Sequence, residues 1–219
     1  MCIICLWLLC VCLCVPILCF FEADGILAFN HPLNLVAHQV VPAVATGCPV
    51  VIKPSLNTPL SCINFVERLR AAGLEEPWCQ VLLADNAVVD ALAREPAVNY
   101  LSFIGSARVG WQLRSNAAPG TRVALEHGGV GPVIVDKSCD FDTMIPALAH
   151  GAFYHAGQVC VATQRVFVPN SMVDVVSSSL ASAAEFMPVG DPLDIKTKVR
   201  YPFYTFCRAE PLSSRRLAL

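Results

Sequence analysis

Short apolar runs alternate with helical patterns along most of this chain, and this alternation restricts the fold more than any other feature of the sequence. Apolar runs of strand length that are bounded by Gly or Pro are typical of buried strands, whereas apolar residues at intervals of three and four are typical of helices. Strands joined by helices predict parallel βαβ units with right-handed crossovers, so we expect an α/β fold. The predicted strands are 25–29, 48–54, 78–84, 98–106, 122–129, 131–136 and 165–169, and the predicted helices are 33–47, 58–73, 87–95, 107–117 and 141–157.

Residues at the ends of the predicted helices support their boundaries. Gly47 and Gly73 end the first two helical patterns, and glycine commonly terminates helices. Thr58 followed by Pro59 predicts that the second helix has Thr58 as its N-cap and Pro59 at its first position. The last helical pattern breaks at Gly157, just ahead of a cysteine.

The N-terminal segment is apolar in a different way. Residues 1–21 carry no charged side chain and are about long enough to cross a bilayer as a helix, so a membrane anchor is one prediction for them. The alternative is a displaced reading frame joined to a genuine domain. A cleaved secretory signal is disfavoured because no Lys or Arg precedes Lys53. We therefore expect a cytoplasmic chain, or a membrane-associated one if this segment is genuine.

Cysteine spacing and charge exclude further classes. The early cysteines include only one of the C-x-x-C pairs typical of zinc sites, and no His accompanies them: Cys2, Cys5, Cys10, Cys12, Cys14 and Cys19. The later ones are irregularly spaced, as in reduced thiols rather than a disulfide framework: Cys48, Cys62, Cys79, Cys139, Cys160 and Cys207. A net charge of −2 with dispersed basic residues argues against a nucleic-acid partner, because phosphate binding needs clustered Lys and Arg.

Candidate site residues follow the predicted strands. In an open parallel sheet, ligands bind at the carboxyl ends of the strands, so residues that end different strands meet at one edge. Here those residues are Asn30, Lys53, Gly105, Ser106 and Glu126. Cys160 can join them as a nucleophile if helix-end N–H groups or a nearby base lower the pKa of its thiol.

The histidines near this cysteine do not indicate a metal site. His150, His155 and Cys160 follow one another at intervals of five residues, which does not place them on one face of a helix. We therefore expect no metal. A papain-like pairing of His155 with Cys160 is the alternative.

Several strings of the sequence resemble the motifs of the aldehyde dehydrogenase superfamily. In chain order they are FNHPLNL, VVIKPS followed by TPL, SFIGSARVG, LEHGG and GAFYHAGQVC, and the late string VGDPLD also resembles the family. They cover roughly residues 25 to 199, and Glu126 and Cys160 are 160 − 126 = 34 residues apart, as the resemblance requires. Five ordered motifs are far more specific than a single G-Q-x-C string.

The resemblance implies a two-step oxidation of an aldehyde to a carboxylic acid. Cys160 matches the nucleophile, whose adduct with the aldehyde can release hydride to NAD or NADP and leave a thioester. Asn30 matches the residue that stabilises the oxyanion, together with the backbone amide of Cys160. Glu126 matches the general base that activates water to hydrolyse the thioester. His127 stands where the family commonly has Leu, and we expect a satisfied or solvated side chain there.

The same resemblance implies the cofactor contacts. Lys53 and Ser55 match neighbours of the cofactor ribose and phosphate, and the Gly105–Ser106 turn matches the place where the pyrophosphate meets a helix N-terminus. The chain contains no G-x-G-x-x-G fingerprint. Leu56 stands where many family members have Glu, which would repel a 2′-phosphate, so NADP is admissible beside NAD.

The resemblance also divides the chain. We expect an apolar segment at 1–24, a partial, Rossmann-like cofactor domain at 25–128, the start of an α/β catalytic domain at 129–199 and an irregular tail at 200–219. Family members have further segments before and after this region, including the strand that forms homo-oligomers, so homo-oligomer formation is not expected here. Two hypotheses follow: an enzyme acting on a small-molecule aldehyde, or a non-catalytic truncated remnant, with membrane association through residues 1–21 as an option.

Overall fold

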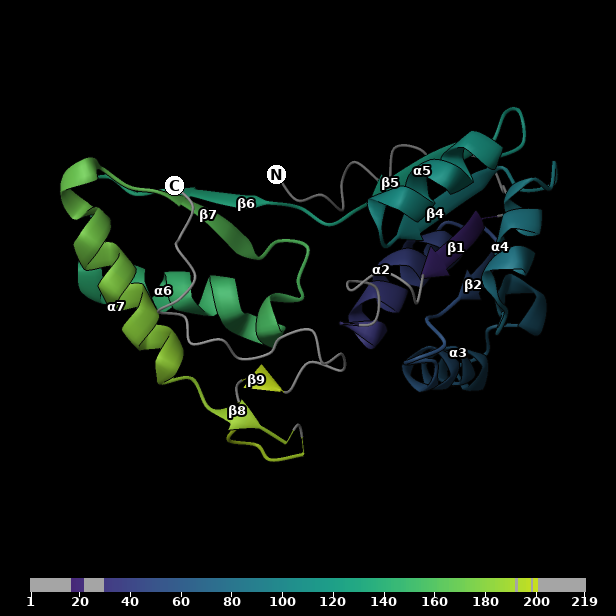
Figure 1. Cartoon of the computed structure of the whole chain (residues 1–219). Helices are drawn as coiled ribbons and strands as arrows, with labels where there is room; N and C mark the ends of the chain where they lie inside the picture. The colour runs from purple at the N-terminus through teal and green to yellow at the C-terminus, as the bar shows by residue number, and fades with distance from the viewer. Residues whose placement is uncertain (1–16, 22–29, 192, 198, 201–219) are drawn as a thin grey trace. The chain divides into compact units, whose positions relative to one another are not determined.

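The computed structural model describes residues 17–21, 30–191, 193–197 and 199–200. The chain divides into two compact units, an N-terminal unit that ends at Gly128 and a C-terminal unit that begins at Gly129 (Figure 1).

A five-stranded parallel sheet forms the centre of the N-terminal unit. Its strands are β1 (Ile17–Phe21), β2 (Val50–Lys53), β3 (Cys79–Val81), β4 (Tyr100–Ile104) and β5 (Arg122–Glu126). They lie in the order β3-β2-β1-β4-β5, and every neighbouring pair is parallel. The predicted α/β fold with a parallel, Rossmann-like sheet is therefore confirmed.

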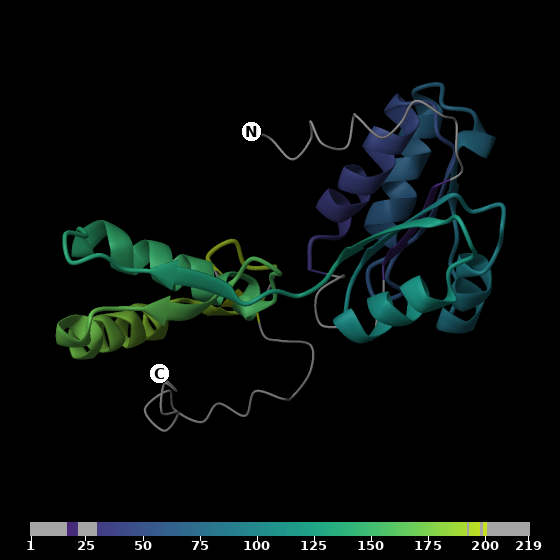
Figure 2. The ribbon, with the colours of Figure 1, turned by 90° about the horizontal axis from the view of Figure 1, so that it is seen from above.

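Helices cover both faces of this sheet (Figure 2). They are α2 (Pro32–Ala45), α3 (Leu60–Ala71), α4 (Asn86–Ala93) and α5 (Ala107–Asn116), with a short 3-10 turn, η1 (Glu76–Trp78), before β3. Successive residues of β2 show the two faces, because side chains alternate along a strand. Val50 and Ile52 pack in the cluster with α2 and α3, whereas Val51 packs against the cluster with α4 and α5.

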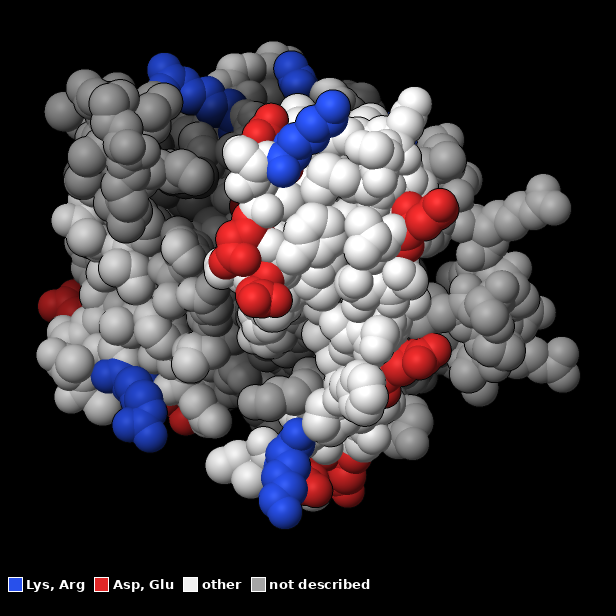
Figure 3. Space-filling view, turned by 90° about the vertical axis from the view of Figure 1, so that its left-hand side faces the viewer, with Lys and Arg blue, Asp and Glu red and all other residues white. Residues whose placement is uncertain are grey.

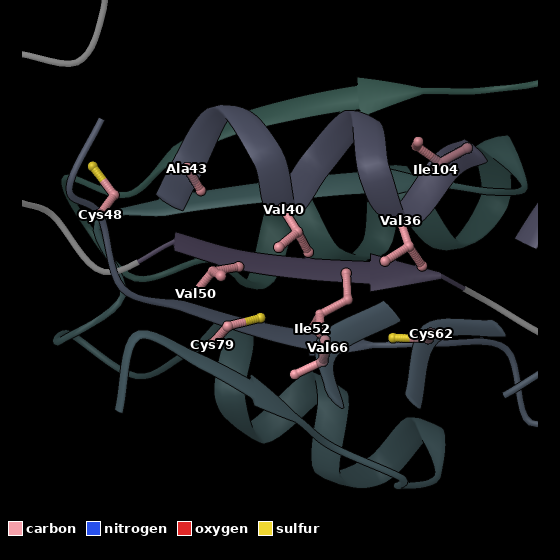
Figure 4. Close-up of a cluster of buried hydrophobic side chains, with 10 residues drawn as sticks. All are labelled: Val36, Val40, Ala43, Cys48, Val50, Ile52, Cys62, Val66, Cys79 and Ile104. Carbon is pink, nitrogen blue, oxygen red and sulfur yellow. The ribbon is translucent and has the colours of Figure 1, made fainter. Parts of the chain in front are cut away.

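The larger of the two cores contains three thiols (Figure 4). Its buried members are Val36, Val40, Ala43, Cys48, Val50, Ile52, Cys62, Val66, Cys79 and Ile104. Burial raises the pKa of the Cys62 thiol to about 12 and that of Cys79 to about 11. A thiol in such surroundings stays protonated and behaves as a small apolar side chain.

The expectation of a membrane helix over residues 1–21 fails at its C-terminal end. Ile17–Phe21 is β1, the central strand of the sheet, and residues 1–16 lie outside the described part. A short apolar run fits a buried parallel strand as well as a helix, so the pattern alone could not separate the two. No helix of the described residues is long and apolar enough to cross a membrane. The predicted strand at 25–29 also lies outside the described residues.

The helix boundaries agree with the predictions in most places. Gly47 and Gly73 follow α2 and α3 with φ of +73° and +103°, conformations that glycine adopts without strain. The start of α3 differs by one residue, because its N-cap is Pro59 and not Thr58. The Pro59 carbonyl accepts the N–H groups of Cys62 and Ile63, both at 3.1 Å, while the Thr58 hydroxyl is buried without a partner among the described residues.

The C-terminal unit is smaller and less covered. Strands β6 (Gly131–Ile134) and β7 (Thr163–Phe167) pair in parallel, and helices α6 (Phe141–Phe153) and α7 (Val173–Glu185) pack on each other. Two 3-10 turns, η2 (Tyr154–Gly157) and η3 (Asn170–Met172), and a short pair, β8 (Val189–Gly190) and β9 (Val199–Arg200), complete it. Strands β6 and β7 and helix α6 confirm predicted elements, although α6 ends at Phe153 rather than at Gly157. The short pair β8–β9 was not predicted. Helix α7 was not predicted.

Candidate active site

The carboxyl ends of the strands bring several predicted residues to one edge of the N-terminal unit. Lys53 ends β2 and pairs with Phe20 of β1, which in turn pairs with Phe103 of β4. Glu126 ends β5 and pairs with Ile104, one residue further along. At roughly 4.8 Å between neighbouring strands, the ends of β2 and β5 lie roughly 14 Å apart. The edge is shared, but its two ends are well separated.

Asn30 reaches the same edge through α2. This helix joins β1 to the parallel strand β2, so it runs opposite to the strands and begins at their carboxyl ends. Figure 4 agrees, with Val36 near the head of the purple strand β1 and Ala43 near its tail. Asn30 is buried just before the helix, and its Oδ1 accepts the N–H of His31 at 2.9 Å. The N–H groups of such a carboxamide are suited to donate to an oxyanion.

Lys53 and Ser55 are almost completely buried at the end of β2. Their exposed fractions are 1% and 2%. The Ser55 Oγ accepts the N–H of Asn57 at 3.3 Å, and the Ser55 carbonyl accepts the N–H of Thr58 at 3.1 Å, so a tight turn follows the strand. Lysine is rarely buried to this degree unless its charge has a partner. The surrounding fold must therefore hold the Lys53 side chain in a defined place.

The Gly105–Ser106 turn connects β4 to α5. The Gly105 N–H donates to the Glu126 carbonyl at 3.1 Å, and Ser106 is the N-cap of α5, with no side-chain bond to the first turn. A Cβ on Gly105 would lie 2.5 Å from Cζ of Phe103, so the close approach of the turn to the ring requires glycine. The first turn of α5 thus presents backbone N–H groups at the carboxyl edge, the arrangement that binds phosphate in other proteins.

Glu126 and His127 leave the sheet in different environments. Glu126 is exposed, whereas the His127 ring packs on Gly110 of α5 and meets Trp111 edge-on at 5.6 Å between ring centres. The His127 Nε2 is buried and has no partner among the described residues. The expectation of a satisfied or solvated side chain therefore does not hold for Nε2, because the neighbouring helix covers this nitrogen.

Cys160 lies in a turn of the C-terminal unit. The Ala162 N–H donates to the Val159 carbonyl at 3.0 Å, which places Cys160 inside a tight turn, and its side chain is half-buried. A Cβ on Gly129 would lie 2.8 Å from the Cys160 carbonyl oxygen, so the two backbone segments pass closely. Gly129 is the first residue of the C-terminal unit, so this close approach lies within that unit.

The segment before Cys160 is strained. His155 and Ala156 have φ of 52° and 58°, a left-handed conformation that side chains with a Cβ rarely adopt. Non-glycine residues in this conformation cluster at functional sites. The Tyr154 ring contacts His150 in a tilted arrangement, with ring centres 5.0 Å apart, and meets His155 edge-on, with centres 4.3 Å apart. The described residues contain no group of three or more His, Cys, Asp or Glu able to hold a metal ion.

The structure thus brings part of the predicted site together within one unit. Asn30 and the residues from β2, β4 and β5 share the edge of the N-terminal unit, and Cys160 belongs to the C-terminal unit. One side chain of this edge was overlooked in the sequence: Arg108, in the first turn of α5 and exposed. In the sequence, Arg108 could have been identified as a basic residue two positions after the turn that is predicted to bind phosphate.

Comparisons with known proteins cover most of the chain. The model of the aldehyde dehydrogenase family matches residues 23–200. An aldehyde-dehydrogenase-like protein of Sinorhizobium fredii is 38% identical over 175 residues, which are 80% of this chain and 34% of that protein. Lactaldehyde dehydrogenase of Methanocaldococcus jannaschii is 38% identical over 180 residues, or 80% and 39% of the two chains. The chain therefore spans little more than a third of the length of these curated relatives.

Solved structures of aldehyde dehydrogenases are also similar to this chain. A crystal structure of aldehyde dehydrogenase C from Pseudomonas syringae, in complex with NAD+ and octanal, matches with a TM-score of 0.79 and 31% identity, over 85% of this chain and 38% of that one. Succinate-semialdehyde dehydrogenase from Burkholderia pseudomallei matches with a TM-score of 0.78 and 29% identity, over 85% and 38% of the two chains.

Proposed function

The chain belongs to the aldehyde dehydrogenase family, and from this premise we propose that it carries the machinery that oxidises an aldehyde to a carboxylic acid with NAD or NADP. The observation that carries this proposal is the shared edge of the parallel sheet. It gathers a buried lysine, a helix N-terminus, a buried asparagine and an exposed carboxylate, which suit cofactor binding, oxyanion stabilisation and base catalysis.

Cys160 is the proposed nucleophile. Its sulfur forms a bond to the aldehyde carbon, and the C=O electron pair moves onto oxygen to give a thiohemiacetal anion. An aldehyde alone is a poor hydride donor, and this tetrahedral anion is a good one. The location of Cys160 within a tight turn supports the assignment, because the turn fixes the position of the Cys160 sulfur relative to the backbone N–H of the same residue.

Asn30 is the proposed donor to the oxyanion. Its carboxamide is buried and held by its oxygen, which fixes the orientation of its N–H groups. A donor fixed before the reaction stabilises developing charge without the cost of reorganisation.

Glu126 is the proposed general base. Once hydride has left, the carbon is held as a thioester; water attacks it, Glu126 takes the proton, and the thiolate leaves with the C–S electron pair as the acid forms. The exposure of Glu126 supports this role, because the carboxylate must be reached by water.

Lys53, Ser55, Gly105 and Ser106 are the proposed cofactor contacts. A bound nicotinamide dinucleotide supplies the hydride acceptor. The N–H groups at the start of α5 and the buried cation at the end of β2 match the pyrophosphate and ribose of such a ligand.

Turnover with a panel of aldehydes tests the proposal. Reduction of NAD or NADP, followed by absorbance, should depend on aldehyde and fall about a thousandfold or more in Cys160→Ala. Cys139→Ala, another half-buried thiol of the same unit, is the matched control and should stay near wild type. Glu126→Gln should accumulate the acyl group on Cys160, seen as added mass. Aldehyde-dependent turnover that survives Cys160→Ala would contradict the mechanism.

Exposed apolar side chains favour a second candidate, a non-catalytic family member. Ile134 on β6 and Phe167 on β7 are paired across the strands and are 84% and 55% exposed. In Figure 3, acidic and basic side chains are scattered over the face that it presents, with uncharged surface between them. A folded chain that binds cofactor but leaves every aldehyde unreacted would establish this candidate instead.

A further inference from the structure

We infer that His127 is a positioning residue for Glu126, and that its ring fixes the peptide of Glu126 against helix α5. The inference rests on the proposed function, because it takes Glu126 as the base that hydrolyses the thioester. It deepens that function by linking this base to the turn that is proposed to hold the cofactor pyrophosphate.

The His127 ring occupies a gap in α5 where Gly110 has no side chain. A Cβ on Gly110 would overlap Nε2 of the ring and lie 2.9 Å from its Cδ2, so the ring and the helix backbone are in direct contact. The ring also meets Trp111 edge-on, with 5.6 Å between ring centres. The Arg114 guanidinium lies over the Trp111 ring, 5.3 Å from its centre, and such a contact restrains the indole. Consecutive residues of α5 therefore hold one imidazole.

The contact of His127 with α5 is one of shape. Its Nε2 is buried and has no hydrogen-bond partner among the described residues. A buried polar atom without a partner costs stability, and in a native structure it calls for an explanation. The explanation offered here is that the ring fills the gap beside Gly110, and that this packing outweighs the unsatisfied nitrogen.

The peptide of Glu126 is held from the side of β4 as well. Glu126 pairs with Ile104, and its carbonyl accepts the N–H of Gly105 at 3.1 Å. Glu126 itself is exposed, whereas its neighbour His127 is half-buried. Because consecutive Cα atoms are about 3.8 Å apart, a shift of the packed imidazole is passed on to Glu126.

The ring of Phe103 joins the proposed cofactor turn to the gap that holds His127. It is 1% exposed. A Cβ on Gly105 would lie 2.5 Å from its Cζ, and a Cβ on Gly110 would lie 3.1 Å from its Cδ1. The start of α5 therefore rests on one buried ring. A ligand held by the first N–H groups of α5 is linked to Glu126 by two short routes, the Gly105 amide and the His127 ring.

Separate measurement of the two half-reactions tests the role of His127. The first turnover of reduced cofactor reports hydride transfer, and the decay of the acyl group on Cys160, followed by mass, reports hydrolysis. His127→Ala should leave the first turnover within about twofold of wild type and slow hydrolysis about tenfold to a hundredfold, because a displacement of about 1 Å at a reacting group can cost that much. His38→Ala, exposed on α2, is the matched control and should change neither rate.

Two further variants test how His127 acts. In the Glu126→Gln background, His127→Ala should have no further effect on hydrolysis, because a residue that acts through the base has no effect once the base is absent. His127→Leu refills the gap beside Gly110 without a ring nitrogen, so it should restore hydrolysis to within about threefold of wild type. Circular dichroism establishes that each variant is folded.

Hydrogen exchange of the full chain tests the link to α5 without turnover. ADP-ribose carries the pyrophosphate and both riboses of the cofactor but no nicotinamide, so it probes the proposed phosphate-binding turn. Saturating ADP-ribose should slow amide exchange in peptides that cover residues 126–129 about tenfold in the wild-type chain, and less than about twofold in His127→Ala.

The outcomes separate this inference from the proposed function. Equal losses of first turnover and hydrolysis in His127→Ala, a further loss in the Glu126→Gln background, or a His127→Leu variant as slow as His127→Ala each overturn the inference and leave the proposed function intact. Equal protection by ADP-ribose in the wild-type chain and in His127→Ala overturns the link to α5. A folded wild-type chain that neither binds ADP-ribose nor oxidises any aldehyde overturns the proposed function, and the inference with it.

Discussion

The two units of this chain bury their apolar residues to very different extents. In the N-terminal unit, five strands have helices on both faces, and both core clusters of the described residues lie there. In the C-terminal unit, the two-stranded sheet β6–β7 leaves Ile134 84% and Val161 77% exposed nearby, and Phe186 beyond α7 is 84% exposed. Three or more strands with a hydrophobic face, or packing against a helix, are needed for independent stability, and β7 contacts α6 in this unit. The comparison teaches that the first unit holds its site residues through its own core, whereas the second has little core with which to do so.

A matched pair of phenylalanines gives the largest expected contrast. Phe103 on β4 is 1% exposed and Phe167 on β7 is 55% exposed. Phe103→Ala should lower the free energy of unfolding by about 3–5 kcal/mol, because it removes the centre of a packed cluster. Phe167→Ala should cost well under half of that. Urea unfolding followed by circular dichroism measures both, and similar losses in the two variants would break the comparison.

The contact between α5 and His127 should be the next most sensitive. A Cβ on Gly110 would overlap Nε2 of His127 and lie 3.1 Å from Cδ1 of Phe103. Gly110→Ala should therefore cost about 1–3 kcal/mol, despite the better helix propensity of alanine. Adding His127→Ala should recover most of this loss, as a double-mutant cycle of urea midpoints would reveal. Purely additive losses would place the steric conflict elsewhere.

Alkaline pH should weaken the N-terminal unit through its buried thiols. The folded pKa of Cys62 is about 12, raised by burial from the usual 9.0. A raised pKa means that the stabilising contribution is complete below pH 9 and is lost as pH rises toward 12, because the unfolded thiol ionises first. The expected loss near pH 10 is about 1 kcal/mol. Cys62→Ala should roughly halve the fall of the urea midpoint between pH 8 and 10.5, because the buried Cys79, with a pKa of about 11, still contributes. Cys139→Ala, in the other unit, should leave the slope as in wild type.

The smallest expected effect concerns the turn before Cys160. Ala156 has φ of 58°, so Ala156→Gly should raise stability by about 0.5–1 kcal/mol by relieving left-handed strain. Ala152→Gly, within α6, is the matched control and should lower stability by about 1 kcal/mol. Thermal melts of the two variants should shift in opposite directions. A fall in melting temperature for Ala156→Gly would mean that the turn is not strained.

Much of the fold of the N-terminal unit was predictable because its elements have local signals. Apolar runs ending at Pro54 or Gly105, and helical patterns ending at Gly47 or Gly73, identified most strands and helices of the described residues. β1 was misassigned because an apolar run does not reveal whether lipid or a sheet will cover it. α7 was missed because the run Ser177–Ser179 interrupts an otherwise helical pattern of apolar residues.

The positions of the candidate residues on the sheet were predictable, but their surroundings were not. Strand ends and family motifs pointed to Lys53 and Glu126, and topology alone implied their common edge. The covered imidazole of His127 depends on Gly110, seventeen positions earlier in the sequence, and no local pattern reports such a contact. The left-handed His155 and Ala156 were equally hidden, because positive φ is uncommon for any residue other than glycine and no local pattern reports it.

The position of β1 has a consequence for how the sheet grows during synthesis. Among the described strands it emerges from the ribosome first, yet it ends in the middle: β2 and then β3 join on one side, and β4 and then β5 join on the other. Each later strand can pair with an exposed edge of the sheet, and none must be inserted between two strands that are already paired. Assembly can therefore proceed outward from a single seed as the nascent polypeptide lengthens.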